Sequence, residues 1–126
     1  MKSVNERSTA VLVITFSDEN KALVTPSSAK YQIKDENTGT ILTPWTALTV
    51  TSSSHTLVID QNNNRILDDG NDSETKIVTV VSEYSSPTKQ CTSEFKYEVK
   101  NLHGVPVEVV LDVTGGVIIG GDVSLV

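Results

Sequence analysis

Cysteine, alanine and aromatic residues are scarce in this chain, which has one Cys, four Ala and six aromatics among 126 residues. A lone Cys91 excludes an internal disulfide framework and agrees with synthesis in a reducing compartment. No apolar run approaches the about 20 residues that span a membrane. Asp and Glu outnumber Lys and Arg by 16 to 10, whereas phosphate binding needs clustered basic side chains. We therefore expect neither a membrane nor a nucleic acid as partner.

Branched residues are abundant instead: Val, Thr and Ile make up 41 of the 126 residues. Their stiff side chains suit a pleated strand and slightly disfavour a helix. Turn signals recur roughly every 8–12 residues, as in sandwiches and barrels. The length fits one domain, which we divide into an N-terminal tail (1–7), an antiparallel all-β sandwich (8–103) and a C-terminal β-strand or arm (104–126). We expect about seven strands, followed by this C-terminal β extension.

Period-two alternation of apolar and polar residues marks the individual strands. The pattern predicts strands at 9–16, 29–34, 40–48, 55–60, 75–84 and 94–100. Of these, 77–81 is apolar on both faces and should be central, whereas 94–100 alternates strictly and should have one wet face. Gly39 closes a turn in which a positive φ is expected.

The same alternation predicts the core. The residues that it places inside are Leu12, Ile14, Phe16, Tyr31, Ile33, Trp45, Leu57, Ile59, Val78, Val80, Phe95, Tyr97 and Val99. For Trp45 we expect an anchor between the two sheets. The alternative is a partly exposed indole that stacks on a sugar ring, as in carbohydrate-binding modules.

The order of signals from Ser8 to about Leu102 resembles a family, the small Ig-like or fibronectin-III-like structural proteins of tailed bacteriophages and prophages. The segments that carry the resemblance are Ala10–Asn20, Val24–Tyr31 with its "TPSSAKY" sequence, Asp35–Thr40, Pro44–Thr46 and Phe95–Leu102. The resemblance covers about three quarters of the chain and implies an Ig-like sandwich in a virion component, without enzymatic chemistry.

The function that we expect is therefore structural: a virion protein of a tailed bacteriophage, acting by protein–protein contacts in capsid decoration, head–tail joining or the tail. Its partners would be other virion proteins and further copies of itself. The polar start, Met1 to Ser8, lacks the hydrophobic segment of a secretory signal, so we expect synthesis in the host cytoplasm. The alternative function is an Ig-like adhesion or glycan-binding module of a cell-surface or secreted protein.

Few residues form a pattern typical of catalysis or metal binding, and we expect no catalytic residue, no cofactor and no bound metal. The loop from Asp60 to Asn71 places Asp60, Asn62 and Asn64 at alternate positions, as a calcium loop does. However, Arg65 stands where the sharp turn needs Gly, and Asn71 stands where a bidentate Glu belongs. We expect a solvated loop. Neither histidine sits in a nucleophile motif, and neither lies near Cys91 in the sequence.

The C-terminal segment is unusually apolar, because Val, Ile and Leu make up 12 of the 22 residues from Val105 to Val126. Such a segment cannot remain a free tail in water. One interpretation is that Val107 to Val113 adds an edge strand to its own sheet. The interpretation that we favour is strand pairing with a neighbouring subunit. The candidate subunit-contact residues are Val107, Val109, Leu111, Val113, Val117, Ile118 and Ile119.

Truncation of Phe95 to Ala tests the predicted register of strand 94–100. If the ring is fully buried, the free energy of unfolding should fall by roughly 3–5 kcal/mol. Denaturant unfolding of the two proteins measures this difference. A Phe95 ring that points into solvent would contradict the register.

Overall fold

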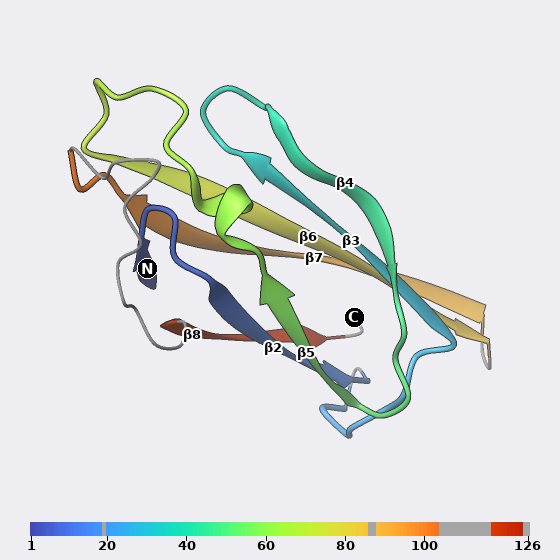
Figure 1. Cartoon of the computed structure of the whole chain (residues 1–126). Helices are drawn as coiled ribbons and strands as arrows, with labels where there is room; N and C mark the ends of the chain where they lie inside the picture. The colour runs from blue at the N-terminus through green and yellow to red at the C-terminus, as the bar shows by residue number, and fades with distance from the viewer. Residues whose placement is uncertain (19, 86–87, 104–116, 125–126) are drawn as a thin grey trace.

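The computed structural model describes residues 1–18, 20–85, 88–103 and 117–124, which form two β-sheets (Figure 1). The strands are β1 (Ser3–Asn5), β2 (Ala10–Ser17), β3 (Ser28–Asp35), β4 (Ile41–Leu48), β5 (Ser54–Ile59), β6 (Ser73–Ser85), β7 (Thr88–Lys100) and β8 (Val117–Ser124). A 3-10 turn, η1 (Gln61–Asn64), follows β5. The prediction of an all-β chain is therefore confirmed.

One sheet has five strands in the order β1-β7-β6-β3-β4, and the other has three in the order β5-β2-β8. Most neighbours pair antiparallel, as expected. Two pairs are parallel, namely β1 with β7 and β2 with β8. The sheets are therefore mixed, because both chain ends add a strand that no hairpin connects to its neighbour.

A single hydrophobic cluster joins the inner faces of the two sheets, which gives the layered arrangement of a β-sandwich. Ten of the thirteen predicted core residues are buried in it: Leu12, Ile14, Phe16, Ile33, Leu57, Ile59, Val78, Val80, Tyr97 and Val99. Tyr31 and Phe95 are partly buried and pack against the cluster. The period-two assignment is thus confirmed for β2, β3, β5, β6 and β7.

The prediction that Trp45 anchors the core is wrong, because 45 % of the surface of this residue is exposed. Trp45 lies three residues before Leu48, which packs against the core, so the period of two places the indole on the outer face of the five-stranded sheet. Thr46 pairs with Tyr31 and Thr43 with Ile33, so β4 also bulges where Pro44 and Trp45 stand opposite the single residue Gln32.

Strands β6 and β7 behave as their sequences predict. β6 pairs with both β3 and β7, so it is central, and Ile77, Val78 and Val81 are buried on its two faces. In β7 Tyr97 and Val99 are buried while Glu94 and Lys96 are exposed. Because Phe95 itself is only partly buried, we expect its truncation to cost less than a full core Phe would.

The two ends of the chain hold more structure than the sequence pattern indicated. Ser3–Asn5, within the expected N-terminal tail, pairs parallel to β7, and Val4 is buried. At the other end, β8 pairs with β2 along its whole length. No helix in the described ranges is long and apolar enough to cross a membrane.

Candidate functional site

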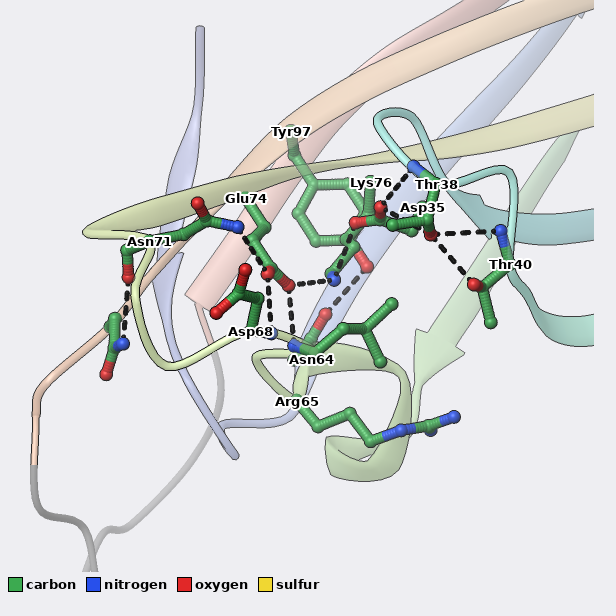
Figure 2. Close-up of polar contacts among 12 residues, drawn as sticks. Asp35, Thr38, Thr40, Asn64, Arg65, Asp68, Asn71, Glu74, Lys76 and Tyr97 are labelled. Carbon is green, nitrogen blue, oxygen red and sulfur yellow. Dashed lines mark hydrogen bonds and ion pairs between the residues drawn. The ribbon is translucent and has the colours of Figure 1, made fainter.

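A buried polar cluster lies at one end of the sandwich, where Lys76 sits between two carboxylates (Figure 2). Its Nζ atom is 3.0 Å from Oδ1 of Asp35 and 2.9 Å from Oε1 of Glu74. The side chain of Lys76 is fully buried, and those of Asp35 and Glu74 are 1 % and 4 % exposed. This geometry is a buried ion triad with a net charge of −1.

The strand period places all three charges on the inner face. Asp35 follows Ile33 by two residues on β3, and Lys76 precedes Val78 by two on β6. Asp35 stands directly opposite Lys76, and Lys76 stands opposite Tyr97 on β7. Our sequence analysis missed Lys76, although its even spacing with the buried Val78 and Val80 was the available signal.

Glu74 organises the loop that precedes β6. Its Oε1 accepts a hydrogen bond from the backbone N of Leu67 at 2.7 Å, and its Oε2 accepts one from the backbone N of Asp68 at 3.0 Å. Oε2 also accepts a bond of 3.0 Å from Nδ2 of Asn71. With Lys76, this one carboxylate therefore has four donors around it.

Asp35 organises the turn between β3 and β4 in the same way. Its Oδ2 accepts hydrogen bonds of 2.9 Å from both the backbone N and the Oγ1 of Thr38. Gly39 completes the turn with φ of 73°, as expected, and its N–H bonds to the backbone oxygen of Asp35. The turn thus begins at a carboxylate that also pairs with Lys76.

The hydrogen-bond donors around Asp35 and Glu74 keep both carboxyl groups ionised. Burial alone would raise the pKa of Asp35, but the hydrogen bonds from Thr38 and Lys76 outweigh it and lower that pKa. Burial likewise opposes the charge of Glu74, and the donors from Leu67, Asn71 and Lys76 lower its pKa. Both carboxylates are therefore held in the charged form.

A second polar link connects the two sheets beside the triad. The hydroxyl of Tyr97 donates to Oδ1 of Asn64 at 2.6 Å, and Nδ2 of Asn64 donates to the backbone oxygen of Ser8 at 2.7 Å. The backbone oxygen of Asn64 accepts from the N–H of Arg7. Burial raises the pKa of Tyr97, which keeps its hydroxyl protonated as a donor. Asn64 thereby ties η1 to β7 and to the crossover between β1 and β2.

The contacts of the triad stabilise the local structure. Each carboxylate already accepts from several fixed donors, and Lys76 bridges two acids, so the geometry fixes charges instead of leaving a group poised for proton transfer. An open polar hollow lies beside the triad, lined by Glu36, Asn37, Asn71, Ser73, Glu74 and Thr75. In it the Glu74 carboxylate is already engaged by the loop.

The loop from Asp60 to Asn71, which was compared with a calcium loop, is ordered by its own hydrogen bonds. Oδ1 of Asp60 caps η1 by accepting from the backbone N of Asn62 at 2.8 Å. Asn64 points to Tyr97, and Arg65 donates to the backbone oxygen of Asn62. Within the described ranges, no group of three or more His, Cys, Asp or Glu side chains is arranged to hold a metal ion.

The remaining reactive side chains are dispersed over separate elements. His55 lies on β5, His103 follows β7 and pairs with Asp72 at 3.0 Å on the exposed surface. Cys91 is buried near the start of β7 and is in no disulfide. None of these positions adjoins the triad in the strand register.

The exposed aromatic surface is on the opposite side of the five-stranded sheet from the core. Nζ of Lys30 lies 5.2 Å from the centroid of the Trp45 ring, within the range of a cation–π contact. Ile41, also on β4, is 47 % exposed. Both apolar side chains are on an edge strand, because β4 pairs with β3 alone.

The predicted subunit-contact residues fall into two groups. Val107, Val109, Leu111 and Val113 lie outside the described residues. Val117, Ile118 and Ile119 begin β8, where they stand in register with Ala10, Val11 and Leu12 of β2. This part of the segment therefore forms a strand within its own sheet.

Comparison with known proteins adds no relative to this picture. No protein-family model, no curated protein and no solved structure matches this chain.

Replacing Lys76 by Met tests the triad. The substitution leaves two carboxylates buried without their ammonium partner, and such a loss typically costs about 3–5 kcal/mol. The control is Lys96→Met, which removes an exposed pair with Glu36 and should cost far less, because water screens an exposed ion pair. Urea unfolding at neutral pH measures both differences, and equal costs would contradict the role of the triad.

The depressed pKa values of Asp35 and Glu74 also predict acid sensitivity. A carboxylate whose pKa is lower in the folded state stabilises the fold above its unfolded pKa, and this contribution is lost as pH falls through the folded pKa. Thermal unfolding should therefore show a melting temperature that drops below about pH 4. The variant Asp35→Asn should show a shallower drop, and a slope equal to that of the parent would argue against this coupling.

Titration with calcium tests the loop from Asp60 to Asn71. We expect no tightly held ion, because its side chains already bond to backbone groups and Arg65 adds positive charge. Calorimetry at low salt measures the heat of binding. A stoichiometric exothermic site of micromolar affinity that disappears in Asp60→Ala would show the expectation to be wrong.

Proposed function

We propose that this chain is a structural, non-enzymatic component of a tailed-bacteriophage virion, acting through protein–protein contacts in capsid decoration, head–tail joining or the tail. Its sequence resemblance supports this proposal, as does a polar interior organised for rigidity. It would be made in the host cytoplasm and end in the particle. Its partners would be other virion proteins and copies of itself.

The strand order supports an Ig-like arrangement within this proposal. An Ig sandwich packs strands A, B, E and D against C, F and G, and its variable form adds C′. β2 and β5 would correspond to B and E, and β3, β6 and β7 to C, F and G, with β4 as C′. β8 would then occupy the place of A beside B, but in the parallel direction.

The observation that carries the proposal is the outward position of Trp45. Burying a Trp side chain typically contributes strongly to an interface, and Trp is enriched among residues that dominate binding energy. Here the indole lies on the outer face of β4 with 45 % of its surface exposed, and Ile41 is exposed on the same strand. Because Pro44 removes a backbone donor from this edge, contact there would be made by side chains.

A second candidate function is glycan binding, which the exposed indole also favours. Sugar rings stack on exposed aromatic faces, and Trp45 is available for such a contact. However, Lys30 already lies over the ring, so one face at most remains. Glycan-binding platforms usually present several aromatics, whereas Trp45 is the only aromatic among the large exposed apolar side chains of the described residues.

Incorporation into particles tests the first candidate. An antibody against the chain should label virions purified by density gradient, and the chain should sediment with them. We expect Trp45→Ala to reduce incorporation while leaving the melting temperature unchanged, because the side chain is outside the core. The matched control is Val58→Ala, which truncates a 61 % exposed residue on the other sheet. A chain that stays in the soluble fraction while particles assemble would overturn the proposal.

Intrinsic fluorescence tests the second candidate without any label, since Trp45 is the only tryptophan. Titration with representative neutral and acidic oligosaccharides should leave its emission unchanged if the chain is a virion contact protein. Saturable quenching by one sugar class, altered in a Lys30→Ala variant that removes the cation over the ring, would favour the glycan module instead.

A further inference from the structure

Strand β8 forms a complete ladder with β2. Eight residue pairs run in parallel register, from Ala10 opposite Val117 to Ser17 opposite Ser124. On its other side β2 pairs with β5 only from Ala10 to Thr15. The C-terminal strand therefore covers the whole of one edge of β2.

This edge of β2 needs a strand beside it. Ala10, Leu12, Ile14 and Phe16 are almost fully buried on the inner face of β2. Without β8 the adjoining backbone N–H and C=O groups would be left unpaired along a strand that runs through the core. An uncovered edge of this kind recruits another strand. The fold thus contains an acceptor position that some eight-residue strand must fill.

The covalent connection does not specify which copy supplies that strand. Parallel neighbours cannot be joined by a hairpin, and β8 is reached only after the 16 residues that follow Lys100 at the end of β7. A chain of this length spans at most about 55 Å when extended, which exceeds the width of a small domain.

The sequence of β8 contains little that would make it pair with its own chain in preference to another copy. Gly120 and Gly121 stand in its middle, opposite Val13 and Ile14. Glycine in a strand interior loses more conformational entropy and supplies no side chain to pack. The position opposite the core residue Ile14 thus contributes backbone pairing alone. Backbone pairing is the same whether the strand belongs to this copy or to its neighbour.

We infer that the β2 edge accepts β8 from a second copy of this chain, in the same parallel register, so that copies join by exchanging the C-terminal strand. The inference rests on the proposed function and deepens it, since it names the partner and the contact. Reciprocal exchange gives a closed dimer, whereas one-way donation gives a ring or a filament. Both outcomes link subunits through main-chain hydrogen bonds.

Cysteine pairs placed in different copies test this inference. Thr15 and Asp122 are register partners, and Thr15 is half-buried on the outer face of β2. One chain carries Thr15→Cys and the other Asp122→Cys, both with Cys91→Ser to remove the native thiol. The two chains are co-expressed, so that strand choice occurs during folding, and then oxidised. We expect a covalent heterodimer in non-reducing electrophoresis and intact-mass measurement.

Two controls make the result specific. Thr15→Cys co-expressed with Val117→Cys has cysteines at opposite ends of the paired strands, so it should give no heterodimer. Each single-cysteine chain expressed alone reports random coupling. If Cys91→Ser lowers the yield of folded protein, Cys91→Ala replaces it, because the side chain is small and buried.

A single chain that carries both Thr15→Cys and Asp122→Cys separates exchange from the wider proposal. If this chain closes its disulfide entirely within itself and the co-expressed pair gives no heterodimer, strand exchange is overturned. Incorporation of the internally closed chain into virions would then show that the structural function stands without exchange. If exchange occurs, the internally closed fraction should lose self-association, as sedimentation measures.

Discussion

The ion triad of Asp35, Lys76 and Glu74 is the constraint on which one end of this sandwich depends. Two buried acids and one buried base leave an excess negative charge, which would be costly in an apolar core. Backbone and side-chain donors of Thr38, Leu67 and Asp68 offset it. The turn after β3 and the loop before β6 must therefore adopt the conformations that aim these donors inward. The ionised cluster thus determines the shape of two segments that have little apolar burial of their own.

The apolar core and the polar end both hold the two sheets together, through different interactions. Through the middle of the sandwich, side chains from β2 and β5 pack on those from β3, β6 and β7. At the polar end, Tyr97 reaches across to Asn64, which holds Ser8. Hydrophobic packing is non-directional, whereas these short hydrogen bonds fix position. The polar end therefore fixes how β1, η1 and β2 lie against the larger sheet.

Alternation of residue types predicted most of the core, and its failures have physical causes. Lys76 follows the alternation, but lysine is read as exposed unless its partner is known, and Asp35 lies 41 residues away in the sequence. Trp45 was expected inside because a lone Trp usually anchors a sandwich core, but it lies three residues before Leu48, which packs against the core, and so falls on the outer face. The parallel pairing of β8 depends on contacts between chain ends, which local periodicity does not contain.

The strands that form the sheet edges relate the fold to the proposed role. In the five-stranded sheet one edge is β1, with only three residues, and the other is β4, with a bulge and Pro44. Short, kinked or proline-containing edges resist pairing with other chains, so this sheet would meet a partner through side chains such as Trp45. In the three-stranded sheet, β2 takes its outer neighbour from the end of the chain. A side-chain surface on one sheet and a strand-accepting edge on the other would let each copy contact two neighbours at once, which is what a repeating particle component requires.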